Sequence, residues 1–319
     1  MYQFARPPAC LRAITGLSGQ HWLSLVCAKG AFPDNCKSDV SDFTGSNPVL
    51  ATMTAISALL ELATSIAVTA GDVAAKRRAQ GVEVVASKSS LEDVVTHADR
   101  ETETLIRSLI ADARPDDGFL GEESGADAGS SGLTWVVDPI DGTVNYLYGI
   151  RHYAVSVAVV EGNPDPLSWR ALAGAVVNPA IGEVFTAANG HGAWLGSTRI
   201  SIAPAVELSQ ALIGTGFSYR AETRVKQAEA IVRLVERVRD IRRQGSAALD
   251  LCSVAVGRLN GYFERGLNPW DHAAGALIAQ EAGARVSGLG GTRANIDFVL
   301  AAEPAMAVLL EGVLLEFGA

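Results

Sequence analysis

Cysteine is scarce in this chain and forms no recognisable motif. Among its 319 residues only four are cysteines, and none belongs to a C-x-x-C pair; they are Cys10, Cys27, Cys36 and Cys252. Because three of the four lie in the first 36 residues, a disulfide framework for the body of the protein is not expected. We interpret the chain as a cytoplasmic protein.

An excess of positive charge and long apolar runs are also missing. The chain carries 26 basic and 35 acidic side chains, a formal net charge of −9, so nucleic acid is not an expected partner. The longest stretch without a charge, 43–60, contains Gly45 and Pro48, whereas a bilayer span needs about 20 predominantly apolar residues. The N-terminus lacks the uninterrupted apolar stretch of a signal peptide. No membrane association is therefore expected.

Several familiar catalytic motifs are absent. The sequence contains no G-x-x-x-x-G-K-[ST] loop, no H-E-x-x-H and no G-x-S-x-G. Gly214-Thr215-Gly216 follows an apolar run but lacks the third glycine of a dinucleotide-binding loop. What the chain does have is a composition of 48% apolar and 19% charged residues, which excludes a disordered or fibrous protein and favours a globular one.

The chain divides near residue 50. Residues 1–52 show no sustained periodicity and contain four prolines, so we predict a poorly structured N-terminal extension. An amphipathic helical pattern begins only after Met53, and a sharper hypothesis is that translation starts at Met53. Residues 53–319 are then expected to form one folded catalytic domain. Intact-mass measurement of the protein from its native host would distinguish the two versions.

Helix and strand patterns alternate along residues 53–319. The periodicity predicts helices over about 53–78, 98–112, 226–243 and 246–256, and another from Pro269 onward. Apolar runs predict strands over about 134–137, 153–160, 173–177 and 183–187. This order of elements indicates an α/β layered fold of stacked helices and sheets.

The segment 135–143 carries the most informative chemistry. An apolar strand ends abruptly in Asp138 and Asp141, and Pro139 restricts the turn between them. The two carboxylates and the carbonyl of Ile140 are hard oxygen ligands suited to Mg²⁺. The backbone at Gly142 and the hydroxyl of Thr143 would suit a phosphate. The alternative is an ordinary strand-to-turn corner, in which Asp and Gly are common.

Three further acids are candidates. Glu122 ends a short apolar run, Asp271 would lie in the first turn of the helix that begins at Pro269, and Asp99 begins another helix. Each has a plainer reading, as a solvated loop acid for Glu122 and as a helix-start residue for Asp271 and Asp99. Their conjunction with Asp138 and Asp141 favours a metal site.

Three motifs together resemble a known family. Gly121-Glu122-Glu123-Ser124, the segment 138–143 and the segment 270–275 closely resemble the signatures of the inositol monophosphatase family, in the same order and at the same spacing. The similarity covers most of residues 53–319, including 93–99 and 245–250, and is greatest to the bacterial inositol-1-monophosphatase branch. The resemblance implies a five-layer αβαβα sandwich, a homodimer, a requirement for Mg²⁺ and inhibition by Li⁺.

The resemblance also implies roles for individual residues. The positions that match metal ligands are Glu122, Asp138, the carbonyl of Ile140, Asp141 and Asp271. Asp99 matches an acid near a further, weaker metal position. Thr143 with Glu122 matches the pair that positions the nucleophilic water, and Gly142 with Thr143 matches the phosphate-binding backbone. The positions that match the substrate pocket are Gly245, Ser246, Ala247 and Glu264.

The function implied is Mg²⁺-dependent hydrolysis of inositol 1-phosphate, a small phosphorylated polyol, to inositol and phosphate. Histidinol phosphate, fructose 1,6-bisphosphate and 3′-phosphoadenosine 5′-phosphate remain alternative substrates, because Glu264 is the main residue that favours a polyol. A different class of function is a regulatory binding protein on the same scaffold, which would use a basic cluster formed by Arg237, Arg239, Arg242 and Arg243.

Overall fold

The computed structural model describes residues 48–82, 84–87 and 94–317. Helix α2 (Pro48–Gln80) therefore begins five residues before Met53 and runs through it. Most of the predicted N-terminal extension, 1–47, and part of the 93–99 segment lie outside the described residues. The division of the chain at residue 52 and the start of translation at Met53 stay predictions.

The larger sheet has eight strands, and nearly all of its neighbouring strands are antiparallel. Only β3 and β5 pair in parallel. The strand order is β10 (Thr198–Ile200), β9 (Gly192–Leu195), β8 (Glu183–Ala188), β7 (Arg170–Asn178), β6 (Ala154–Glu161), β5 (Leu133–Asp141), β3 (Gly118–Gly121) and β4 (Gly125–Asp127). The predicted strands are confirmed as parts of β5, β6, β7 and β8.

Helices α2 and α3 (His97–Ala113) cover one face of this sheet. Small and branched side chains of α2, such as Ala63 and Ile66, pack with Ile106 of α3 against Trp135 and Val157 of the sheet. By length and composition, the Ala55–Gln80 part of α2 is the one helix among the described residues that could cross a membrane. Its packing against the sheet is that of a core helix.

Two helices, α6 (Ala247–Ala255) and α7 (Pro269–Glu281), lie between the larger sheet and a second sheet of five strands. The second sheet has the order β12 (Asp240–Arg242), β11 (Leu212–Thr215), β13 (Gly261–Glu264), β15 (Val299–Ala302) and β14 (Arg285–Ser287). One apolar cluster joins both helices to Val136 and Val176 on one side and to Tyr262 and Val299 on the other. The middle helix layer is therefore buried on both faces.

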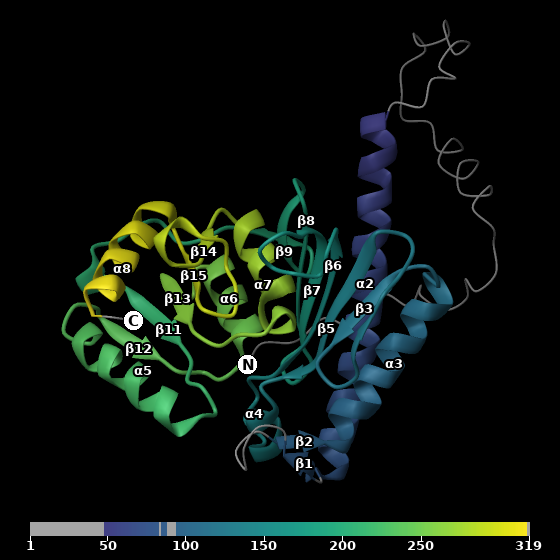
Figure 1. Cartoon of the computed structure of the whole chain (residues 1–319), viewed down its shortest axis with the longest axis horizontal. Coiled ribbons are helices and arrows are strands. Elements are labelled where there is room, and N and C mark those ends of the chain that lie inside the picture. The colour runs from purple at the N-terminus through teal and green to yellow at the C-terminus, as the bar shows by residue number, and fades with distance from the viewer. Residues whose placement is uncertain (1–47, 83, 88–93, 318–319) are drawn as a thin grey trace, which may run out of the picture. The chain divides into compact units, whose positions relative to one another are not determined.

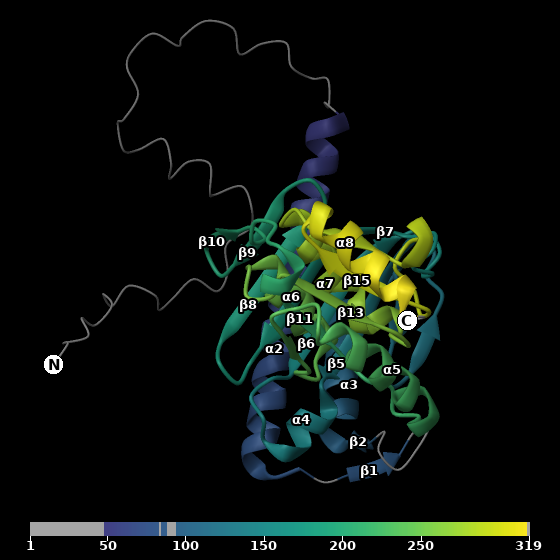
Figure 2. The ribbon, with the colours of Figure 1, turned by 90° about the vertical axis from the view of Figure 1, so that its left-hand side faces the viewer.

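Helices α5 (Ala221–Leu234) and α8 (Pro304–Glu316) cover the outer face of the five-stranded sheet. Leu234 and Leu310 from these helices pack with Ile213, Phe263 and Leu300 of the strands. The layers follow one another across Figure 1 and lie one behind another in Figure 2. The predicted five-layer αβαβα sandwich is confirmed.

One predicted helix was too long. The pattern over 226–243 predicted a single helix, but α5 ends at Leu234 and the chain turns into the edge strand β12 at Asp240. The apolar residues Val235 and Val238 continue the helical spacing. Val238 is nevertheless buried against the five-stranded sheet from the connecting turn. Tertiary packing therefore overrides local periodicity at this point.

Candidate metal and phosphate site

The parallel pairing of β3 and β5 brings the first acids together. Gly121, the last residue of β3, is the register partner of Val137 in β5. The backbone N–H of Glu122 donates to the carbonyl oxygen of Val137 at 3.3 Å. Glu122 and Asp138 are thus the next residues at the same edge of two adjacent strands. Residues 16 positions apart in the sequence become neighbours because parallel strands end on one edge.

An irregularity in β5 explains how Asp138 and Asp141 can point into the same region. In a regular strand, side chains three residues apart point to opposite faces. The pairing of β5 with β6 shifts register between Asp138 and Asp141, which are opposite Ser156 and Ala154. This is one extra residue on β5, a β-bulge, and such bulges redirect side chains. Both carboxylates are buried, with Asp138 2% exposed and Asp141 8% exposed.

Helix α7 supplies the third acid. The backbone N–H of Asn268 donates to Asp271 Oδ2 at 2.6 Å, and Pro269 occupies the first turn. The predicted position of Asp271, in the first turn of a helix that begins at Pro269, is confirmed, and the structure adds a capping box with Asn268. It fixes the Asp271 carboxylate at the start of a helix that lies between the two sheets. The positive end of the helix dipole favours the ionised carboxylate there.

Asp99 begins α3 in the same way and contacts the region of Thr143. Asp99 is 1% exposed, and its Oδ2 accepts hydrogen bonds from the backbone N–H of Thr96 at 2.7 Å and from the Thr96 hydroxyl at 2.5 Å. The Thr143 hydroxyl lies 3.3 Å from Asp99 Oδ1 and 3.1 Å from the carbonyl oxygen of Ile140. Thr143 therefore links two of the predicted oxygen ligands.

The pKa values of these acids reflect how close they lie to one another. Burial and the charges of Glu122, Asp141 and Asp271 raise the pKa of Asp138 well above its usual range, and a hydrogen bond with the Glu122 carboxyl raises it further. Burial, then the charges of Glu122 and Asp141, raises the pKa of Asp271 in the same direction. Acids from β5, α7 and the residue after β3 thus oppose one another's ionisation.

Asp141 and Asp99 have smaller shifts because nearby donors stabilise their charged forms. Burial raises the pKa of Asp141 to about 6, while hydrogen bonds from Ser246 and from the N–H of Ala248 lower it. Burial raises the pKa of Asp99 to about 7, against the hydrogen bonds from Thr96; the charges of Glu122 and Glu123 add to the rise. Clusters of acids with raised pKa values are typical of functional sites.

The loop before α6 closes onto the turn after β5. Gly142 has φ +90°, and a Cβ on it would lie 3.0 Å from the carbonyl oxygen of Gly245. Glycine is therefore required at this close approach. The side-chain amide of Asn145 donates to the carbonyl oxygen of Gln244 at 2.7 Å and so holds the loop in place. Residues 245–247, predicted to line the substrate pocket, lie next to Gly142 and Asp141.

Glu264 stands at the end of β13. The Tyr262 hydroxyl donates to Glu264 Oε2 at 2.5 Å. Burial, together with the charges of Asp250 and Asp141, raises the pKa of Glu264 to about 7. The hydrogen bond from Tyr262 acts in the opposite direction and lowers this pKa. With Gly216, Lys226 and Phe298, Glu264 lines a cavity of about 330 Å³. It is within electrostatic reach of the acid cluster but lies outside it.

No closed coordination shell has formed among these acids. Within the part of the chain that the structure describes, no three His, Cys, Asp or Glu side chains make a group already arranged to hold a metal ion. The physical reason lies in the local bonds: Asp138 accepts from the N–H of Ile140, Asp141 from Ser246, and Asp271 from Asn268. Each of these three carboxylates therefore has one oxygen engaged by a local donor.

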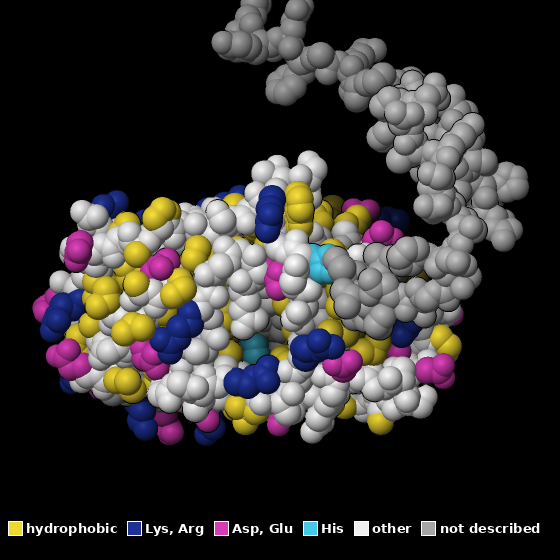
Figure 3. Space-filling view, turned by 90° about the horizontal axis from the view of Figure 1, so that it is seen from above, with side chains coloured by type: hydrophobic (Ala, Val, Ile, Leu, Met, Phe, Trp, Pro, Cys, Tyr) yellow, Lys and Arg dark blue, Asp and Glu magenta, His cyan; other side chains and the backbone are white. Residues whose placement is uncertain are grey.

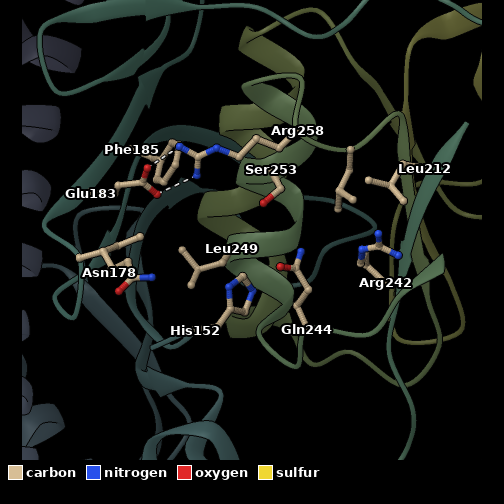
Figure 4. Close-up of a pocket in the computed structure, with 12 residues that line it drawn as sticks. His152, Asn178, Glu183, Phe185, Leu212, Arg242, Gln244, Leu249, Ser253 and Arg258 are labelled. Atoms are coloured by element: carbon tan, nitrogen blue, oxygen red, sulfur yellow. Dashed lines mark hydrogen bonds and ion pairs between the residues drawn. The ribbon is translucent and has the colours of Figure 1, made fainter. Parts of the chain in front are cut away.

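A second cavity, of about 200 Å³, lies beside α6 and contains none of the predicted site residues. Figure 4 shows Arg258 and Glu183 paired across one side of it, with His152 and Gln244 on the other. Beneath it, Asp250 accepts from the Gln244 amide at 2.8 Å and lies 3.5 Å from His152 Nε2. Sequence reasoning missed this buried acid, although the segment 245–250 contains it.

Comparison with known proteins identifies the family and the fold. The family model described as the inositol monophosphatase family matches residues 55–314. The chain belongs to the inositol monophosphatase family. It is 50% identical over 219 residues to the inositol-1-monophosphatase SuhB of Mycobacterium tuberculosis. The aligned region covers 66% of this chain and 73% of that protein. It is thus a phosphatase, and the predicted family resemblance is confirmed.

Two other relatives extend this result. The chain is 38% identical over 230 residues to the Nus factor SuhB of Haemophilus influenzae, across 72% of this chain and 84% of that protein. The crystal structure of the extragenic suppressor protein suhB from Bartonella henselae superimposes with a TM-score of 0.74 at 33% identity, across 81% of this chain and 98% of that one. The inositol monophosphatase fold is therefore shown by sequence and by structure.

Proposed function

We propose that the chain is a Mg²⁺-dependent phosphomonoesterase that hydrolyses inositol 1-phosphate to inositol and phosphate. The observation that carries the proposal is the mutual repulsion within the group Glu122, Asp138, Asp141 and Asp271: the charges of the other acids contribute to the raised pKa values of Asp138 and Asp271. These four acids come from three segments of the chain and repel one another. A cation bound between them would offset this repulsion.

The donor set fits Mg²⁺. Glu122, Asp138, Asp141, Asp271 and the carbonyl of Ile140 would hold it, since all five offer oxygen and Mg²⁺ prefers oxygen ligands. When bound, the cation supplies positive charge for phosphate oxygens and lowers the pKa of a coordinated water. Asp99 would support a further cation position through Thr143, whose hydroxyl it faces at 3.3 Å.

The remaining residues would bind the phosphate and direct the water. The backbone at Gly142 and the Thr143 hydroxyl would hold phosphate oxygens, because Gly142 permits a close approach to the backbone. Glu122 and Thr143 would orient the attacking water in line with the leaving oxygen, with Glu122 accepting a proton. The acids themselves do not attract a phosphate, so catalysis depends on the cation.

The alcohol side of the substrate would face Glu264 and the start of α6. A carboxylate accepts hydrogen bonds from hydroxyls, which favours a polyol such as inositol. Ser246 and Ala247 would border the same side, next to Asp141. This part of the proposal is supported by the similarity to the Mycobacterium tuberculosis relative, an inositol-1-monophosphatase. Dimer formation is proposed on the same family basis.

A substrate panel tests the proposal. We expect inositol 1-phosphate to be hydrolysed faster than histidinol phosphate, fructose 1,6-bisphosphate and 3′-phosphoadenosine 5′-phosphate, each assayed with Mg²⁺ and with EDTA. Activity on the preferred ester should disappear in EDTA and fall on titration with Li⁺. Equal turnover with and without a divalent cation would contradict the metal-dependent mechanism, and a different best ester would contradict the substrate.

A regulatory role is the second candidate, favoured by the Nus factor SuhB relative. The basic cluster proposed for it is only partly free, because Arg242 pairs with Asp240 at 2.6 Å and Arg237 lies 3.6 Å from Glu316. If this role holds, Arg242→Ala with Arg243→Ala abolishes capture of a protein partner while hydrolysis persists. Capture that survives both substitutions rejects this surface as the docking site.

A further inference from the structure

A groove outside the acid cluster has the opposite electrostatic character. It encloses about 620 Å³ between the start of β7, helix α7 and the edge strand β14, and it contains none of the predicted site residues. We refer to it as the arginine groove, defined by Trp169, Arg170, His272, Arg285, Ser287 and Arg293. On the face seen from above in Figure 3, Lys and Arg side chains border a recess with a histidine at its floor.

The lining of the arginine groove contains no acid. Three arginines line it, from the start of β7, from β14 and from the loop after β14, while no aspartate or glutamate does. This is unexpected in a chain with a net charge of −9 and 35 acidic side chains. A concave surface that gathers one sign of charge concentrates ligands of the opposite sign. The groove is therefore suited to an anion.

The three arginines differ in how their charge is used. Arg170 pairs with Glu161 at 2.7 Å, and Arg285 with Glu311 at 2.6 Å. Arg293 donates instead to the backbone carbonyl of Trp169 at 2.6 Å, and no ion pair to it is seen among the described residues. One N–H bond to a neutral carbonyl leaves most of the guanidinium donors of Arg293 for a ligand. Arg293 is thus the main cationic group of the groove.

Two buried polar atoms in the lining have no partner. His272 Nε2 and Ser287 Oγ make no hydrogen bond, although His272 is 2% exposed and Ser287 is 7% exposed. Buried polar atoms in proteins are nearly always hydrogen-bonded, and an unpaired one indicates a missing partner. The two residues lie on α7 and β14, two elements that follow one another in the chain. Both residues line the same cavity as Arg293.

Part of the groove lining is aromatic and apolar. The Trp169 and His272 rings lie with centroids 6.0 Å apart, and Leu277 and Val286 extend the apolar lining. A volume near 620 Å³ lies within the range of small-molecule sites, about 300–1,000 Å³, and is far larger than a single phosphate requires. Arginine forks match the paired oxygens of phosphate groups. The groove is therefore suited to an organic molecule with a phosphate-like head.

We propose that the arginine groove binds a small organic phosphate at a site separate from the acid cluster. The head group lies against Arg293, with His272 Nε2 and Ser287 Oγ as further hydrogen-bonding partners. The organic part lies against Trp169 and the apolar face of α7. Binding here needs no divalent cation, because the groove supplies its own positive charge. The acid cluster, in contrast, repels a phosphate unless a cation is bound.

Calorimetric titration of the full chain with phenylphosphonate tests this proposal. The P–C bond of this probe is not a phosphate ester bond, so binding is measured without turnover. In EDTA, we expect one probe molecule to bind per chain, and benzyl alcohol, which lacks the anionic head, not to bind. Arg293→Gln should weaken the probe about tenfold or more, since charge-assisted hydrogen bonds to the head group are lost.

Two further variants keep the test decisive. Ala276→Leu fills the groove from α7 without changing its charge, and it should also weaken binding about tenfold or more. Arg237→Gln removes the same charge from an exposed site beside Glu316, and it should leave the affinity unchanged. Absence of binding in EDTA, or binding that neither Arg293→Gln nor Ala276→Leu weakens, overturns the proposal. Because hydrolysis is not measured, failure here leaves the proposed phosphatase function untouched.

Discussion

The hydroxyl of Ser246 donates a hydrogen bond of 2.6 Å to Asp141 Oδ2, across 105 positions of the sequence. The same oxygen of Ser246 accepts from the N–H of Leu249, 3.3 Å away, and so caps α6. The N–H of Ala248 in the first turn of α6 also donates to Asp141, at 2.8 Å. One helix start therefore orients an acid of the larger sheet and stabilises its ionised form.

Removal of the Ser246 hydroxyl should affect stability and activity together. For Ser246→Ala we expect a loss of about 1–2 kcal/mol in the free energy of unfolding, because a helix cap and a buried hydrogen bond disappear. The pKa of Asp141 should rise, because the hydrogen bond that lowers it is lost. Chemical denaturation and turnover at fixed pH measure both effects. Ser246→Thr retains the hydroxyl and is the control; if it behaves like alanine, the hydroxyl is not the cause.

Neutralisation of Asp138 should separate catalysis from folding. Asp138→Asn keeps the side-chain shape but removes a charge that Glu122, Asp141 and Asp271 oppose. We expect turnover to fall about a hundredfold or more, since a metal ligand contributes several kcal/mol to the transition state. The thermal midpoint should stay equal or rise, because repulsion is relieved. Asp112→Asn, an exposed change on α3, is the matched control. Near-normal turnover in Asp138→Asn would refute its assigned role.

Magnesium should stabilise the folded chain as well as activate it. A cation that binds only the folded state at about one hundred times its Kd adds about 2.7 kcal/mol to the free energy of unfolding. The gain should be greater at pH 8 than at pH 6, because the cation competes with protons on Asp138 and Asp271, whose pKa values are raised. Differential scanning fluorimetry with and without Mg²⁺ measures it. The same shift in Asp138→Asn would mean that the cation binds elsewhere.

Glu264 should make the protein less stable as the pH rises. Its pKa is about 7 in the folded chain against an ordinary value of 4.5, so the folded state holds a proton that the unfolded state has released between these values. Its contribution is fully present below about pH 4.5 and is lost as the pH rises to about 7, by an amount on the order of 1–3 kcal/mol. Glu264→Gln removes this dependence.

The measurement for Glu264 is the difference between two unfolding free energies. The other acids of the site titrate in both proteins and cancel, so the value for the natural chain minus that for Glu264→Gln should decrease from pH 4.5 to pH 7. Tyr262→Phe removes a hydrogen bond that lowers the pKa of Glu264, and the decrease should then extend to higher pH. A difference that does not change with pH would show that the pKa of Glu264 is the same in the folded and unfolded chains, and it would contradict the prediction.

Local features were predictable because they depend on neighbours in the chain. Asp99 and Asp271 were predicted to lie at helix starts, and both do, each in a capping box with the residue three positions earlier. The apolar strand that leads into Asp138 was visible in the same way, although β5 continues to Asp141. Where packing competes with local pattern, prediction failed: the helical spacing through Val238 continues although the helix ends at Leu234.

Other features have no local signal. The bulge between Asp138 and Asp141 exists only in the pairing of β5 with β6, so the sequence of β5 does not contain it. The buried acid Asp250 is recognisable only through His152 and Gln244. The family resemblance indicated which acids matter, but the residues that orient them could not be identified from single motifs.

Sequence alone determined the kind of chemistry: oxygen ligands at a strand end, acids at two helix starts and glycine where the backbone approaches closely, because each depends on residues within one turn or one strand. Tertiary structure decided which of these groups meet. Parallel pairing of β3 with β5 brings Glu122 to Asp138, and the contact of Arg293 with Trp169 spans 124 positions. Such meetings depend on how buried layers stack, and no short segment of the chain contains that information.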